Sequence, residues 1–118
     1  MATPFNLTGG QAVTVSQTLS QNLWDALDVG NFDILDVELG VLAVSGTVNV
    51  EIDTSMQNSN DDTSWVKVTN LSWSTVTAGY QTVATQTAGF LRYIRWKVTT
   101  TGGSITFTIR GMGRRYGS

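Results

Sequence analysis

The stretch that decides the fold reads ILDVELGVLAV at positions 34–44, and it alternates apolar and polar side chains with the two-residue period of a β-strand. One face of this strand holds Leu35, Val37, Leu39, Val41 and Ala43. The stretch TVNVEIDT at 47–54 repeats the alternation, with its apolar face made of Val48, Val50 and Ile52. Because Ser45-Gly46 between the two runs is a turn signal, the pattern predicts a β-hairpin.

The same alternation returns near the end of the chain, in residues 91–99 and again in residues 104–112. Gly102-Gly103 separates these runs and predicts a second hairpin turn, since glycine tolerates a positive φ. Shorter strands are expected at 12–16, 65–68, 71–76 and 80–85, whereas residues 20–29 fit either a helical turn or a bent strand and loop.

The chain of 118 residues therefore predicts a single all-β domain of about seven or eight short strands. No helix is expected to cover their apolar faces, so we expect two layers of strands to cover each other in an antiparallel β-sandwich of jelly-roll type. We place the domain at residues 12–113, after an N-terminal arm at 1–11 and before a basic C-terminal tail at 114–118.

The residue types that are missing exclude most catalytic chemistry. The chain has no cysteine and no histidine, which excludes disulfides, zinc-thiolate sites, thiol nucleophiles and Ser-His-Asp triads. The carboxylate pairs Asp36/Glu38 and Glu51/Asp53 have a spacing that a glycosidase can use, but outward charges on a half-exposed sheet are the commoner reason for such pairs. We expect no enzymatic activity, no metal and no cofactor.

Two further sequence features are expected to have ordinary explanations. The acidic segment at 58–62 lacks the spacing of a calcium loop and is expected to be a solvated loop. The chain has no apolar run of about 20 residues and no basic and apolar leader at its start, so we expect a soluble protein with no membrane partner.

Charge is divided sharply along the chain, although the net charge is only −2. Every acidic residue lies at or before Asp62, and every basic residue lies at or after Lys67. Pairing across neighbouring strands is one explanation, and acidic-to-basic contact between subunits is another. The net acidity argues against a third explanation, nucleic-acid binding. The candidate interface residues are Asp36, Glu38, Glu51, Asp53, Arg95, Lys97, Arg110, Arg114 and Arg115.

The chain has four tryptophans, and their positions predict different roles. Trp96 alternates with Ile94 and Val98 and is expected in the core. Trp65 follows a polar loop and is expected to cap an edge of the sandwich. Trp24, Trp73 and Tyr80 are less constrained, and each either packs in the core or is exposed to bind a sugar ring or a protein partner.

Four segments together carry a resemblance to a known group of proteins: VEIDTS at 50–55, NDDTSW at 60–65, FLRYIRW at 90–96 and ITFTI at 105–109. This pattern resembles discoidin-like sandwiches over about residues 28–113, and it is similar to small virion proteins of tailed bacteriophages, head decoration or cement proteins among them. Discoidin-like proteins often bind carbohydrate or lipid through their loops.

The resemblance implies a decoration or cement subunit of a phage virion, assembled in the host cytoplasm. Its expected partners are the major capsid protein and copies of itself, with a trimer favoured. The alternative that the resemblance leaves open is a carbohydrate-binding module on a phage or bacterial surface.

Overall fold

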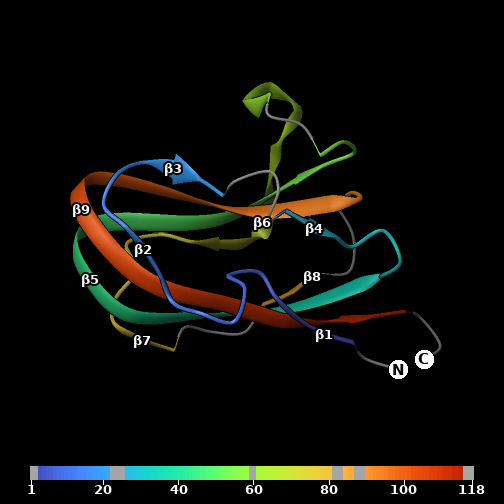
Figure 1. Cartoon of the computed structure of the whole chain (residues 1–118), viewed down its shortest axis with the longest axis horizontal. Coiled ribbons are helices and arrows are strands. Elements are labelled where there is room, and N and C mark those ends of the chain that lie inside the picture. Colours follow the sequence, from blue (N-terminus) through green and yellow to red (C-terminus); the bar gives the residue numbers. More distant parts are fainter. Residues whose placement is uncertain (1–2, 22–25, 59–60, 81–83, 87–89, 116–118) are drawn as a thin grey trace.

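The structure is a computed structural model that describes residues 3–21, 26–58, 61–80, 84–86 and 90–115 (Figure 1). Two long strands dominate it, β5 (Ile34–Ser55) and β9 (Tyr93–Arg114). The shorter elements are β1 (Thr3–Asn6), β2 (Val13–Val15), β3 (Leu19–Ser20), β4 (Leu27–Asp28), the 3-10 turn η2 (Asp62–Ser64), β6 (Val66–Trp73), β7 (Gly79–Tyr80) and β8 (Ala84–Gln86). The expectation of an all-β, antiparallel fold is confirmed.

The long strands β5 and β9 pair with each other from end to end. Their antiparallel register runs from Ile34 opposite Arg114 to Ser55 opposite Tyr93. Both strands bend together, so that one half of the pair lies over the other half (Figure 1). We call the half with residues 34–44 and 104–114 the lower layer, and the half with residues 47–55 and 93–101 the upper layer.

Both predicted hairpins are wrong, because the chain continues through each turn signal as one strand. The register of β5 and β9 shifts between Ser45 and Thr47, which places the two glycine signals together at the bend. Gly46 and Gly102 have φ angles of 69° and 68° there, a region that glycine adopts without strain. A side chain on Gly103 would collide with the carbonyl oxygen of Ser45. These glycines permit a bulged bend within continuous strands. A hairpin turn would need the same local sequence, so the sequence does not distinguish the two.

The remaining strands extend the edges of the two layers. In the lower layer, β1 and β2 pair with β9, while β7 and β8 pair with β5. In the upper layer, β3 and β4 pair with β9, and β6 pairs with β5. The strands thus form a single bent sheet, and a jelly-roll sandwich of two separate sheets is not confirmed.

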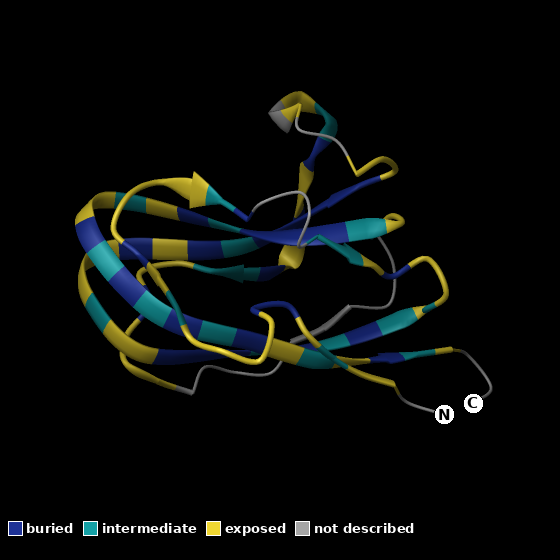
Figure 2. Cartoon of the chain, viewed as in Figure 1, coloured by how far each residue is buried: buried dark blue, intermediate teal, exposed yellow. Residues whose placement is uncertain are grey.

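The core lies between the two layers, and the alternation of each long strand changes phase at the bend (Figure 2). Odd-numbered β5 residues face the core in the lower layer and even-numbered ones in the upper layer. The same rule holds for β9, which buries even-numbered residues in the upper layer and odd-numbered ones in the lower layer. A bulge between Val41 and Ala43 exposes Leu42 and also Ala43, which the sequence pattern wrongly placed on the buried face. The fully buried side chains include Leu35, Val37, Leu39, Val48, Val50, Ile52, Ile94, Val98, Phe107 and Ile109.

The N-terminal segment is more ordered than the expected arm. Residues 3–6 form β1 against residues 110–113 of β9, and Leu7 next to it is buried in the core. The arm prediction is wrong here because a four-residue edge strand is too short to show a period in the sequence. At the other end, β9 continues to Arg114, and residues 1–2 and 116–118 lie outside the described residues. No helix in the described ranges is long and apolar enough to span a membrane.

Candidate functional site

The charge division of the sequence becomes a set of cross-strand pairs between the two long strands. Strand β5 carries four acidic residues and β9 four basic residues, and the end-to-end register places several of them opposite each other. The directly opposed pairs are Glu38–Arg110, Glu51–Lys97 and Asp53–Arg95. The explanation by pairing across neighbouring strands is therefore confirmed, while contact of these residues with another subunit stays a prediction.

In the lower layer the charged pairs lie on the outer face. Arg110 Nε donates to Glu38 Oε1 at 2.8 Å, and Arg114 Nε donates to Asp36 Oδ2 at 3.0 Å. The four side chains remain 24–59% exposed, so each pair contributes only about 0–1 kcal/mol to stability. Arg115 Nε donates to the carbonyl oxygen of Asn31 at 2.8 Å.

These lower-layer pairs border a shallow apolar groove of about 380 Å³. Met112, which is 40% exposed, and half-buried Phe5 supply its apolar part. We call this surface the Met112 face, and its lining residues are Phe5, Asn6, Asp36, Glu38, Arg110, Gly111 and Met112. It brings together three of the nine candidate interface residues, Asp36, Glu38 and Arg110, around the side chains of Met112 and Phe5.

In the upper layer two of the charged residues are buried. Asp53 is 5% exposed and Arg95 is 4% exposed, although both point away from the core between the layers. Both are outward as expected, but the expectation that they are solvent-exposed is wrong. Trp65 lies over Arg95. The guanidinium carbon of Arg95 lies 4.4 Å from the centroid of the Trp65 ring, which is a cation–π contact.

Trp65 reaches this position from the connection between β5 and β6, which rises above the upper layer in Figure 1. The turn η2 just before Trp65 is fixed by Asp61, whose Oδ1 accepts hydrogen bonds from the backbone N and the hydroxyl of Thr63 at 3.0 and 2.7 Å. These bonds hold the pKa of Asp61 below its usual value. The loop expected at 58–62 is thus ordered in part by Asp61, and residues 59–60 lie outside the described residues.

Burial is the largest of the effects that raise the pKa of Asp53 to about 7, since desolvation disfavours the charged carboxylate. A hydrogen bond to Glu51 and the negative charge of Glu51 raise it further, and the charges of Lys97 and Arg95 oppose the rise. Lys67 lies opposite Asp53 on β6. Of the Glu51/Asp53 pair that a glycosidase could use, Asp53 is buried and Glu51 is half-buried.

One ion pair at the loop end of the upper layer was not foreseen from the sequence. Arg92 Nη2 lies 3.2 Å from Asp28 Oδ2, and the Gly30 backbone N donates to Asp28 Oδ1 at 2.9 Å. The Gly30 bond first and the Arg92 bond second hold the pKa of Asp28 below its usual value. No short-range pattern marks this pair, because its members are 64 positions apart.

The aromatic residues take separate places. Trp96 is confirmed in the core, where its ring meets Phe107 edge to face at 5.3 Å and 88°. Trp73 is half-buried and packs against the core from β6. Trp24 and the side chain of Tyr80 lie outside the described residues. Among the described residues, no three His, Cys, Asp or Glu side chains gather as a metal site requires.

Comparison with known proteins gives one similar fold. No protein-family model matches the chain, and no curated protein matches it either. The crystal structure of the SPBc2 prophage-derived protein YomS superposes with a TM-score of 0.56, over 96% of this chain and 94% of that one. The two sequences are only 13% identical, so the likeness is one of fold alone.

Proposed function

We propose that this chain is a structural protein of a bacteriophage particle, and that it decorates or cements the capsid. The observation that carries the proposal is the fold shared with a prophage-derived protein over nearly the full length of both chains. The resemblance of the four sequence segments to phage virion proteins supports the same origin. On this proposal the chain is not an enzyme and needs no cofactor, since its role is to bind other protein subunits.

The Met112 face is the proposed contact surface. Its centre is apolar, with Met112 and Phe5, and the ion pairs Glu38–Arg110 and Asp36–Arg114 lie at its border. Protein interfaces have this arrangement, with aromatic residues, methionine and arginine enriched and a polar rim around an apolar centre. A second copy of the chain or the major capsid protein is the proposed partner, and a trimer is the proposed assembly.

The change Met112→Asp tests this surface. A buried, unpaired carboxylate at the centre of an interface weakens association strongly, so we expect the variant to shift from oligomer to monomer. The measurement is the mass in solution by light scattering over a range of protein concentrations. Because Met112 is 40% exposed in the single chain, the variant is expected to remain folded.

Val66→Asp is the matched control, since Val66 is 55% exposed on β6 in the upper layer, away from the Met112 face. It is expected to leave the mass of the wild type unchanged. A wild type that is monomeric at every concentration, or a Met112→Asp variant that keeps the wild-type mass, contradicts self-association through this face.

A further inference from the structure

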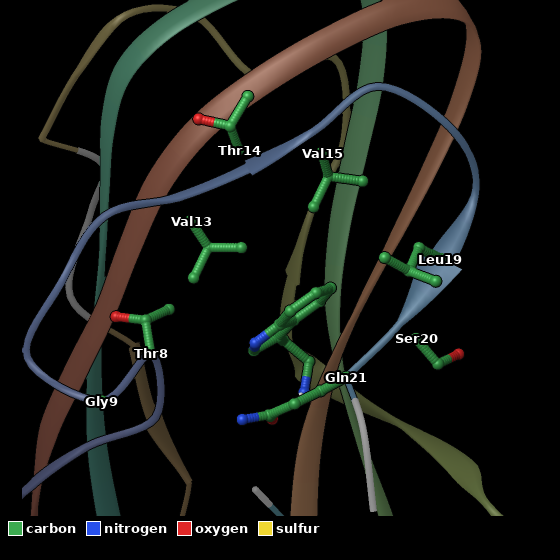
Figure 3. A pocket seen from close by; sticks show the side chains of 9 residues that line it. Thr8, Gly9, Val13, Thr14, Val15, Leu19, Ser20 and Gln21 are labelled. Carbon is green, nitrogen blue, oxygen red and sulfur yellow. Dashed lines mark hydrogen bonds between the residues drawn. The ribbon is translucent and has the colours of Figure 1, made fainter.

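A second hollow lies on the opposite side of β9 from β5, between strands β2 and β3 (Figure 3). Its volume is about 530 Å³, within the range of small-molecule sites in proteins. Thr8 and Val13 stand on one side of it, and Leu19 and Ser20 on the other. Trp96, which belongs to the core, closes it from inside, so we call it the Trp96 pocket. None of the described residues lines both this pocket and the Met112 face.

Among the described residues of the pocket wall, the two threonines Thr8 and Thr14 form hydrogen bonds within the chain through their hydroxyl groups. Thr8 Oγ1 donates to Asn6 Oδ1 at 3.0 Å and accepts from the backbone N of Ile109 at 3.3 Å. Thr14 Oγ1 shares a hydrogen bond of 2.9 Å with Thr106 Oγ1 on the neighbouring strand. These hydroxyls are therefore occupied and do not need a ligand to satisfy them.

Gln21 is also occupied at both ends of its amide. Its Nε2 donates to the carbonyl oxygen of Leu7 at 2.7 Å, and its Oε1 accepts from the backbone N of Trp96 at 3.1 Å. Within the described part of the chain, two polar groups of the wall have no hydrogen-bond partner, the indole Nε1–H of Trp96 and the hydroxyl of Ser20. The indole can only donate. A ligand in this pocket would therefore meet one or two free polar groups among apolar side chains.

We propose that the Trp96 pocket binds an uncharged, mainly apolar group that carries one hydrogen-bond acceptor. Val13, Val15 and Leu19 supply the apolar wall, and the Trp96 indole or the Ser20 hydroxyl donates to the acceptor. Among the residues that the structure describes, no charged one lines the pocket, so an ionic ligand would lose its hydration without a described partner. A sugar needs several converging donors and acceptors. In this wall, Thr8, Thr14 and Gln21 already use their polar side-chain groups in hydrogen bonds within the chain.

Two sources supply this chemistry, an apolar side chain with its backbone carbonyl from a partner polypeptide, or a free small molecule. The probes are acetophenone, which is apolar with one acceptor, and ethylbenzene, which has the same apolar body without it. N-acetyl-leucine amide represents the polypeptide, and N-acetylglucosamine represents a sugar. Each is titrated into the ¹⁵N-labelled full chain, with the Trp96 Nε1–H resonance assigned by its loss in Trp96→Phe.

We expect saturable shifts of the Trp96 indole and of the backbone amides of residues 13–21. Acetophenone should bind roughly 3- to 10-fold more tightly than ethylbenzene, the worth of one net hydrogen bond. If N-acetyl-leucine amide binds at least as tightly as acetophenone, the ligand is a polypeptide segment; tighter binding of acetophenone assigns it to a small molecule.

Val13→Phe should fill the pocket and weaken acetophenone binding at least tenfold, while Val66→Phe, the same change at an exposed site, should leave it unchanged. If Val13→Phe does not fold, Leu19→Asp at the exposed rim replaces it, with the same expected loss. Absence of saturable shifts with both aromatic probes, or N-acetylglucosamine as the tighter ligand, overturns the proposal. These outcomes are independent of whether the chain belongs to a phage particle.

Discussion

Trp96→Ala is expected to lower the free energy of unfolding by about 3–5 kcal/mol, as large aromatic truncations in cores do. Trp96 is 5% exposed, and its ring packs edge to face on Phe107, so it joins the upper layer to the lower one. The truncation would leave a cavity where the two halves of the bent sheet meet. Chemical denaturation monitored by circular dichroism measures the change.

Two comparisons make the Trp96 result specific. Trp96→Phe keeps an aromatic ring against Phe107 and should cost clearly less than Trp96→Ala. Leu19→Ala, at a side chain that is 42% exposed, should cost under about 1 kcal/mol. A loss below about 1 kcal/mol for Trp96→Ala would mean that the layers do not pack through this ring.

The buried carboxyl of Asp53 should make the protein less stable as the pH rises. The pKa of Asp53 is about 7 in the folded chain, against an ordinary value of 3.8 for an aspartate, so the folded state binds the proton more tightly than the unfolded state. The contribution of Asp53 to stability is therefore largest below about pH 4 and is lost between about pH 4 and 7, by on the order of 2–4 kcal/mol. Above pH 7 this contribution is constant.

Asp53→Asn should remove that slope, because the amide does not titrate. We expect the variant to unfold at nearly the wild-type denaturant concentration at pH 4 and at a higher one at pH 8. Glu38→Gln is the control, since Glu38 forms an exposed pair with Arg110 and should leave the slope between pH 5 and 8 unchanged. A wild-type stability that is flat from pH 4 to 7 contradicts the burial of this carboxyl.

The strands could be predicted from the sequence because each of them alternates locally. The strong runs at 34–44, 47–54, 91–99 and 104–112 lie in β5 and β9, except that residues 91–92 precede β9, and Trp96 is in the core as expected. The bend was missed because Ser45-Gly46 and Gly102-Gly103 carry the same local chemistry as a hairpin turn. A bulged bend differs from two hairpin turns only in that Gly46 and Gly102-Gly103, 56 or more positions apart, lie opposite each other in the paired strands.

The site was predicted in part for a similar reason. The acidic and basic runs indicated cross-strand pairs, and the register confirms Glu38–Arg110, Glu51–Lys97 and Asp53–Arg95. The sequence could not show that Trp65 lies over Arg95, because that contact depends on the path of a loop. The Met112 face was not predicted, because Phe5 beside Met112 comes from a segment with no readable pattern.

The most direct test of the proposed function is the protein composition of phage particles from the source that encodes this chain. Particles are purified, heads and tails are separated, and the chain is quantified against the major capsid protein by mass spectrometry. A decoration or cement subunit predicts many copies in the head fraction, in a fixed ratio to the capsid protein. Absence of the chain from purified particles, or a few copies confined to tails, would contradict the account.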